Sequence, residues 1–184
     1  MRPQPGTVIA NRYRLERPLA AGGMGAVWVA RHLQLDIDVA VKLMSESMES
    51  APDSRARFER EAKAVARLSS PHVVRAYDYG IEHGTPFIAM ELLRGESLEA
   101  RLRRLGALGP GAVEEIVRQI AKGLREAHAL GIVHRDLKPA NIFIASSGGD
   151  EIVKILDFGI ARTPASCSPT ITRRAGRCSG RRST

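Results

Sequence analysis

The chain has 184 residues, of which 43% are hydrophobic and 26% are charged, as is ordinary for a soluble globular protein with one or two small domains. Its formal net charge is +8, but residues 163–184 contain five arginines and no acidic residue, which leaves +3 for residues 1–162. The body of the chain is therefore only mildly basic and gives no reason to expect specific binding to nucleic acid.

The cysteines and the apolar runs favour a cytoplasmic location. Both cysteines, Cys167 and Cys178, lie near the C-terminus, so the body of the chain has no disulfide framework and no zinc-type spacing. The N-terminal stretch lacks the apolar core of a signal peptide. No apolar run approaches the length of about 18 residues that spans a membrane, so we expect no membrane segment in this chain.

Alternating apolar residues in the first half predict a compact first lobe. Five strands are expected, at 13–20, 26–33, 38–44, 73–79 and 85–93. The short connections between the first three indicate an antiparallel meander. A helix is predicted from Asp53 or Ser54 to about Leu68, because apolar residues recur on one face and Pro71 follows. We place an N-terminal extension at 1–10 and the lobe at 11–91.

The second half predicts helices followed by a hairpin. Ser97 can cap a short helix that runs to about Leu105, and a long helix runs from Pro110 to Gly131. Its expected apolar stripe consists of Val113, Ile116, Val117, Ile120 and Leu124. Strands at 141–145 and 152–156 flank the turn sequence SSGGD. After Arg162 the periodicity stops, and we expect no regular structure over 163–184.

Several polar residues occur where a phosphate or a cation could bind. The glycine-rich turn LAAGGMGAVW lets backbone N–H groups approach phosphate oxygens, and Lys42 in the apolar strand that follows must either extend its ammonium group to water or find an anion. Glu61, on the predicted helix, could hold that lysine. In the segment HRDLKPAN, Asp136 can accept a hydroxyl proton, while Asn141 offers a hard cation a carbonyl oxygen.

The motifs AAGGMGAV, VAVK, Glu61, HRDLKPAN and DFG occur in this order on the expected elements. The set resembles the N-terminal part of a protein kinase catalytic domain, in the style of the eukaryotic-like bacterial Ser/Thr kinases, over residues 11 to about 162. The resemblance implies an α+β, bilobal fold with a complete N-lobe, of five antiparallel strands and one helix, and a partial helical C-lobe at 92–162. It also implies ATP, Mg²⁺ or Mn²⁺, and transfer of the γ-phosphate to Ser or Thr of a protein substrate.

The resemblance assigns roles to individual residues. Asp136 would be the catalytic base, and Lys138 would face the γ-phosphate. Lys42 would contact the α- and β-phosphates and pair with Glu61. The metal would be held by Asn141 and Asp157. The nucleotide would lie among Gly22, Gly23, Gly25, Val27, Ala40, Lys42, Met90, Glu91, Leu93, Phe143 and Leu156. His134 and Phe158 would pack behind the site.

The arginine-rich tail, residues 163–184, departs from the family. Thr170 and Thr172 resemble autophosphorylation sites of an activation loop, but the family pattern is lost near Arg173, and neither an A-P-E segment nor the C-terminal helices follow. We therefore expect a truncated or frameshifted kinase whose own activity the sequence leaves open. Two alternatives are an inactive nucleotide-binding or interaction module and a phosphate-binding tail. The tail lacks the interleaved aromatic residues of single-strand binders.

Overall fold

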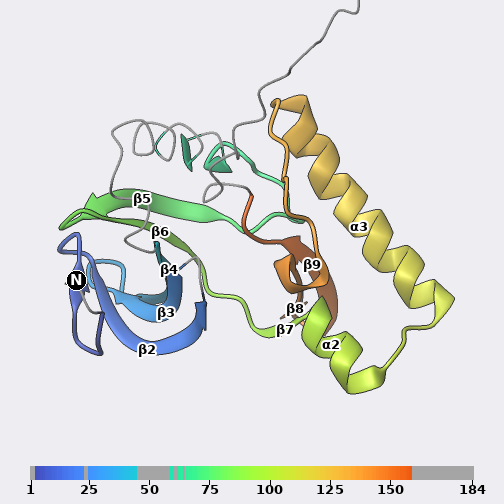
Figure 1. Cartoon of the computed structure of the whole chain (residues 1–184), viewed down its shortest axis with the longest axis horizontal. Coiled ribbons are helices and arrows are strands. Elements are labelled where there is room, and N and C mark those ends of the chain that lie inside the picture. The colour runs from blue at the N-terminus through green and yellow to red at the C-terminus, as the bar shows by residue number, and fades with distance from the viewer. Residues whose placement is uncertain (1–2, 23–24, 45–58, 60–61, 64, 159–184) are drawn as a thin grey trace, which may run out of the picture.

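The computed structural model describes residues 3–22, 25–44, 59, 62–63 and 65–158, which form two parts (Figure 1). The sheet lobe carries the N-terminus, and the helical lobe contains a small sheet and two helices; residues 92–94 connect them. In chain order the elements are β1 (Val8–Ile9), β2 (Tyr13–Gly22), β3 (Gly25–His32), β4 (Ile37–Met44), β5 (Ala76–Glu82), β6 (Thr85–Glu91), β7 (Gly95–Ser97), α2 (Leu98–Leu105), α3 (Pro110–Ala129), the 3-10 helix η2 (Pro139–Asn141), β8 (Ile142–Ser147) and β9 (Asp150–Ile155).

The sheet lobe is built on one antiparallel sheet with the order β1-β2-β3-β4-β6-β5. Strands β2, β3 and β4 form the predicted meander. The chain then returns through β5 at the edge, so that β6 lies between β4 and β5. Strand β1 was not predicted, because two residues are too few to show a period. Strand β7 was also missed, since residues 93–97 read as a plain connection.

The strand predicted at 73–79 begins later than expected, at Ala76. Val73 and Val74 are buried, but they contact the helical lobe instead of continuing β5. Val73 forms a parallel bridge with Ile155, and the Val74 N–H donates to the Ile155 carbonyl at 3.0 Å. The segment before β5 therefore fastens the sheet lobe to β9.

Strand β4 is central in the large sheet, and most of it is buried. Val39, Val41 and Leu43 belong to a core cluster that also contains Ile9, Tyr13, Leu15, Trp28 and Phe87. Since successive side chains of a strand point to opposite faces, Ala40 and Lys42 lie on the other face. The alternation predicted from the sequence thus separates the core of the sheet lobe from the face that carries Lys42.

The helical lobe packs the β8–β9 hairpin under α3. The hairpin turns at Gly148 and Gly149, whose φ angles of 61° and 100° are those of the predicted tight turn. One face of it forms a core cluster with α3 and contributes Ile142, Ile144, Val153 and Ile155. Gly123 allows the close approach of α3, because a Cβ there would lie 3.0 Å from the His72 carbonyl oxygen.

The apolar stripe predicted on α3 is only partly right. The buried residues are Ile116, Gln119, Gly123 and Ala127, with Ile120 and Leu124 packed at the edge of the core. Val113 and Val117 are instead 44% and 56% exposed. The buried row includes the polar Gln119, whose Oε1 accepts a hydrogen bond from the Val153 N–H at 2.8 Å. A hydrophobic pattern cannot detect a row that contains glutamine and glycine.

Parts of the predicted organisation lie outside the described residues. These include most of the helix predicted from Asp53 or Ser54 to Leu68, and all of 163–184. Of that helix, residues 59, 62–63 and 65 are helical, and the Ala66 N–H donates to the Ala62 carbonyl at 2.9 Å. Across the described ranges, no helix combines the length and the apolar character that crossing a membrane requires.

Candidate active site

Lys42 is the buried cation of the sheet lobe, with 7% of its surface exposed. Its cross-strand neighbours are Val27 in β3 and Ile88 in β6, so neither adjacent strand places an anion directly opposite it. Burying an ammonium group is costly unless it is paired. The partner comes from the other lobe: Lys42 Nζ lies 2.6 Å from Oδ1 of Asp157. The pair joins the two lobes.

Asp157 follows β9 and has a left-handed backbone, with φ of 53°. Its two neighbours fix this conformation. The Leu156 N–H donates to the Asn141 carbonyl at 2.8 Å, and Phe158 is 2% exposed and packs on the His134 ring at a centroid distance of 4.8 Å. A strained residue held by its surroundings is typical of functional sites. The predicted packing role of His134 and Phe158 is confirmed.

The loop before η2 holds the Asp136 carboxylate from two sides. Asn141 Nδ2 donates to the Asp136 carbonyl at 2.8 Å and to its Oδ2 at 3.3 Å, while Lys138 Nζ lies 3.0 Å from the same Oδ2. His134 supports the loop from behind: its Nδ1 accepts from the Asp136 N–H at 3.3 Å, and its Nε2 donates to the Leu156 carbonyl at 2.7 Å. The structure thus brings together the acidic, basic and amide groups of HRDLKPAN.

Asn141 and Asp157 fit the oxygen donors of a hard cation. The backbone bond from Leu156 to Asn141 fixes Asn141 beside the residue that precedes Asp157. Both hydrogen bonds of the Asn141 amide use its nitrogen, so its carbonyl oxygen takes no part in them. In the described part of the chain, no three His, Cys, Asp or Glu side chains form a metal cluster. A Mg²⁺ ion held by one or two protein ligands and by phosphates suits this donor set.

The residues predicted to surround the base come from both lobes. On the sheet lobe, Val27 pairs with Lys42 and Ala40 pairs with Met90, so the four share one face of the sheet. In the helical lobe, Phe143 lies on β8 and Leu156 follows β9, and both are half-buried. Glu91 ends β6, and Leu93 lies in the connection that follows.

Gly22 and Gly25 pair with each other at the ends of β2 and β3. Gly25 has φ of 128°, and a Cβ there would lie 2.0 Å from the Leu43 carbonyl oxygen, so no other residue fits this position. The start of β3 therefore requires glycine at position 25. Gly23 lies outside the described residues, as do Glu61, Thr170 and Thr172.

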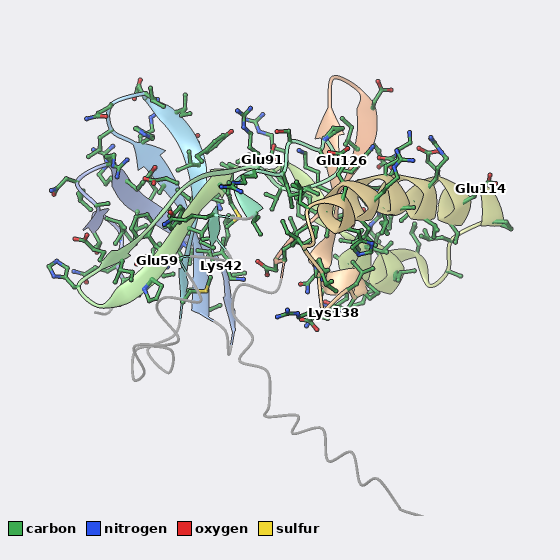
Figure 2. All side chains as sticks on the ribbon, turned by 90° about the horizontal axis from the view of Figure 1, so that it is seen from above. Lys42, Glu59, Glu91, Glu114, Glu126 and Lys138 are labelled. Carbon is green, nitrogen blue, oxygen red and sulfur yellow. The ribbon has the colours of Figure 1, made fainter. Side chains whose placement is uncertain are left out.

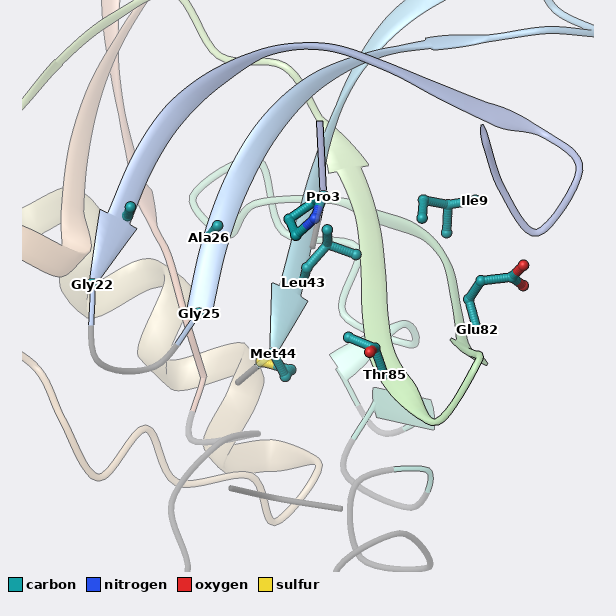
Figure 3. A pocket seen from close by; sticks show the side chains of 10 residues that line it. Pro3, Ile9, Gly22, Gly25, Ala26, Leu43, Met44, Glu82 and Thr85 are labelled. Carbon is teal, nitrogen blue, oxygen red and sulfur yellow. The ribbon is translucent and has the colours of Figure 1, made fainter. Parts of the chain in front are cut away.

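A cavity of about 280 Å³ lies beside these glycines (Figure 3). Its walls are mostly apolar and include Pro3, Ile9, Ala21, Gly22, Gly25, Ala26, Leu43, Met44, Glu82 and Thr85. Leu43 points to the face of β4 opposite Lys42. The cavity is therefore separate from the site around Lys42.

One polar contact of the site was missed in the sequence. Lys154 Nζ, on β9, lies 2.6 Å from Glu91 Oε1. Figure 2 shows Lys42 in the sheet lobe, Lys138 in the helical lobe and Glu91 near the junction of the two. The signal was available, because Lys154 alternates with apolar residues in IVKIL just as Lys42 does in VAVK. Lys42 is buried and Lys154 is half-buried, and in both places an ammonium group shielded from water is costly unless it is paired.

The family model described as protein kinase domain matches residues 13–177. The chain is 42% identical over 172 residues to the serine/threonine-protein kinase pkn3 of Myxococcus xanthus, covering 91% of this chain and 31% of that protein. It is 46% identical over 149 residues to PknE of Mycobacterium bovis, covering 81% and 26%. Among solved structures, a double mutant of the Mycobacterium tuberculosis PknI kinase domain aligns with a TM-score of 0.80 and 34% identity, covering 90% of this chain and 65% of that one.

The chain therefore belongs to the protein kinase family. Within it, the chain is related to the bacterial, eukaryotic-like Ser/Thr kinases, and its fold is a partial kinase fold, as predicted. The chain spans 31% and 26% of the length of these two curated relatives.

Proposed function

We propose that the chain binds ATP with Mg²⁺ or Mn²⁺ between its lobes and transfers the γ-phosphoryl group to a Ser or Thr hydroxyl of a protein. The observation that carries this proposal is the contact of 2.6 Å between Lys42 Nζ and Asp157 Oδ1. This contact pairs the buried ammonium group of Lys42 in the sheet lobe with the Asp157 carboxylate of the helical lobe. The hydrogen bonds that fix Asp136 and Asn141 lie next to it. Phosphoryl transfer depends mainly on such positioning and on charge neutralisation.

The two lysines neutralise phosphate charge at different points. Lys42 contacts the α- and β-phosphates and, in the family's pattern, pairs with Glu61. Lys138 is 46% exposed and close to Asp136, so it can follow the γ-phosphate during transfer. Because Lys42 is buried, its attraction to phosphate is weakly screened by water. A bound phosphate takes the place of the Asp157 carboxylate beside Lys42 and leaves that carboxylate to the metal.

Asn141 and Asp157 hold the metal, which supplies charge neutralisation on the phosphates when bound. The Asn141 nitrogen remains on Asp136, so the same side chain fixes the base and presents its oxygen to the cation. Removal of the Asn141 side chain therefore disturbs both functions. This double role is consistent with the 8% exposure of Asn141.

Asp136 orients the acceptor hydroxyl and takes its proton. The hydroxyl oxygen forms a bond to the γ-phosphorus, the bond from that phosphorus to the β–γ bridging oxygen breaks, and ADP leaves. The Asp136 side chain is 17% exposed, which lets a hydroxyl reach a carboxylate that is otherwise held in place. Thr170 and Thr172 are acceptor candidates for autophosphorylation, in a cytoplasmic setting.

The nucleotide base lies between the apolar residues of the two lobes. Those on the sheet lobe are Val27, Ala40 and Met90, with Glu91 and Leu93 at the connection, and those on the helical lobe are Phe143 and Leu156. The glycines Gly22, Gly23 and Gly25 cover the phosphates. Support comes from the shared sheet face of Val27, Ala40 and Met90.

The test measures binding and transfer separately on the purified chain. Thermal unfolding with and without ATP and Mg²⁺ reports binding, and radiolabelled phosphate transfer to the chain itself and to a generic basic protein reports catalysis. The variant is Asp136→Asn, and the matched control is Asp150→Asn at the exposed start of β9. We expect transfer that is lost in Asp136→Asn and kept in Asp150→Asn, with nucleotide stabilisation in both.

The other outcomes are equally informative. Nucleotide stabilisation without transfer supports the alternative of an inactive nucleotide-binding or interaction module, for which the exposed Val113 and Val117 offer an apolar contact surface. Absence of any nucleotide effect on a folded chain contradicts the kinase and the nucleotide-binding module and leaves the interaction module.

A further inference from the structure

The Glu91 carboxylate joins three segments at the junction of the lobes. Lys154 Nζ lies 2.6 Å from Glu91 Oε1, and the Arg75 N–H donates to the same oxygen at 2.8 Å. The Glu91 N–H in turn donates to the Arg75 carbonyl at 3.0 Å. The side chains of Glu91 and Lys154 are only 21% and 14% exposed. A single carboxylate thus ties the end of β6 to the segment before β5 and to β9.

The position of Lys154 relates this pair to the base-binding residues. Lys154 lies directly opposite Phe143 in the β8–β9 ladder, and Leu156 follows two residues later. Cross-strand partners, and residues two apart along a strand, project to the same face. Lys154 therefore shares a face with the residues assigned to the floor of the base site. Glu91 follows Met90 and precedes the connection 92–94.

Among the described residues, two ion pairs join the sheet lobe to the helical lobe, and the residues assigned to the nucleotide base lie between them. Lys42 and Asp157 form the pair on the phosphate side, and bound phosphate and metal compete for both of its members. Glu91 and Lys154 form the pair on the side of the connection 92–94. Lys154 precedes Asp157 by three residues in the chain. No group that the proposed nucleotide site assigns to a phosphate or to the metal belongs to this second pair. It can therefore persist while the first pair is exchanged.

One backbone bond ties the connection to the helical lobe, because the Ser146 N–H on β8 donates to the Arg94 carbonyl at 2.9 Å. The Ile155 N–H donates to the His72 carbonyl at 2.9 Å, and the Val74 N–H donates to the Ile155 carbonyl at 3.0 Å. These bonds fasten β9 to the segment before β5. A backbone bond from Glu91 to Arg75 joins the end of β6 to the segment before β5, and the Glu91 side chain adds a direct link from β6 to β9.

We infer that the Glu91–Lys154 ion pair is a latch that holds the end of β6, where the connection 92–94 begins, directly against β9 and thereby positions the nucleotide base. The inference rests on the proposed nucleotide site; it adds Lys154 to that site as a positioning residue and gives the Glu91 side chain the same role. Loss of the pair frees the end of β6 from β9 and widens the range of lobe orientations. Nucleotide binding must then restrict the lobes to the one orientation that forms the site, and part of the binding free energy is used for this. We expect the affinity for nucleotide to be about five- to twentyfold weaker.

The experiment compares three variants of the full chain. Lys154→Met removes the charge and keeps the apolar stem, and Lys154→Arg keeps a charge of similar reach. The control is Arg101→Met, which breaks the pairs of Arg101 with Glu96 and Glu151 inside the helical lobe, where the Arg101 side chain is 17% exposed. Affinity for Mg²⁺–ADP is measured by calorimetry, and hydrogen exchange is followed in peptides that cover 72–76 and 88–95.

We expect Lys154→Met to bind nucleotide more weakly and its backbone amides to exchange hydrogen faster in both peptides. Lys154→Arg should behave nearly as the unsubstituted chain does. Arg101→Met should change neither the affinity nor the exchange rates. Unchanged exchange in Lys154→Met overturns the latch, whatever the affinity. An equal loss of affinity in Arg101→Met overturns it as well. If the unsubstituted chain binds no nucleotide, the proposed function fails, and the exchange data still decide whether the latch exists.

Discussion

The ion pair between Lys42 and Asp157 predicts that its two members differ in their effect on stability. The Lys42 side chain is 9% exposed, whereas that of Asp157 is 40% exposed. Removing one partner of a fully buried pair costs about 3–5 kcal/mol, because a buried charge remains unpaired. In Asp157→Asn the buried Lys42 loses its anion, but water reaches the site from the Asp157 side. We therefore expect a loss of about 1–2 kcal/mol for Asp157→Asn.

Lys42→Met should change the free energy of unfolding much less than Asp157→Asn does. It removes the buried charge together with its desolvation cost and leaves a half-exposed Asp157 that water can solvate. We expect a change within about 0.5 kcal/mol of zero. Asparagine tolerates the φ of 53° at position 157, so Asp157→Asn tests the charge and not the backbone.

Thermal unfolding of the nucleotide-free chain measures the difference. A loss of 1–2 kcal/mol lowers Tm by about 3–6 °C in a chain of this size. The control is Arg118→Met, which breaks the exposed i,i+3 pair with Glu115 and should leave Tm nearly unchanged. ATP and Mg²⁺ at a hundredfold excess over Kd should add about 2.7 kcal/mol to the unsubstituted chain and much less to either site variant. A Tm for Lys42→Met as low as that for Asp157→Asn would refute the reasoning.

Three further predictions concern neighbouring features. Gly25→Ala should lower the free energy of unfolding by about 1–3 kcal/mol in a denaturant titration, because the new methyl group meets the Leu43 carbonyl at a φ of 128°; no change would contradict the described turn. Burial, and then the hydrogen bond to Asp78, raise the pKa of Tyr13 to about 12. The stability that this provides is present below about pH 10 and is lost as pH rises toward 12, so Tyr13→Phe should flatten the pH dependence of unfolding there, and equal slopes would count against it. His134→Ala should cost about 2–4 kcal/mol and weaken nucleotide binding, and a calorimetric affinity equal to that of the unsubstituted chain would show that the ring only fills space.

Local features of the sequence determined much of the site. Lys42 was identified because a lysine within an alternating apolar strand needs an anion, and the anion proved to be Asp157. The cluster of Asp136 and Asn141 was predicted because both residues lie within six positions of one loop. In each case the chemistry of the side chain and a short spacing were sufficient, since neighbours in sequence remain neighbours in any fold.

The order of the strands and the burial of α3 were decided only by the tertiary structure. β5 lies at the edge of the sheet and begins at Ala76, because Val73 and Val74 are used to contact β9. The β8–β9 hairpin packs against the face of α3 that contains Gln119, so Val113 on another face stays exposed. Hydrophobic periodicity describes one segment at a time, so it cannot show which of two adequate faces a partner will cover.

The same limit applies to the contact between Glu91 and Lys154. Both residues were visible in the sequence, and Glu91 was even assigned to the nucleotide site, but 63 positions separate them. The sequence by itself determined the kinase motifs and the two lobes, and it assigned residues to phosphate and metal, since these depend on local pattern and residue chemistry. The docking of β9 against the sheet lobe decided which charges meet across the junction, because a long-range ion pair exists only once both lobes have folded and packed together.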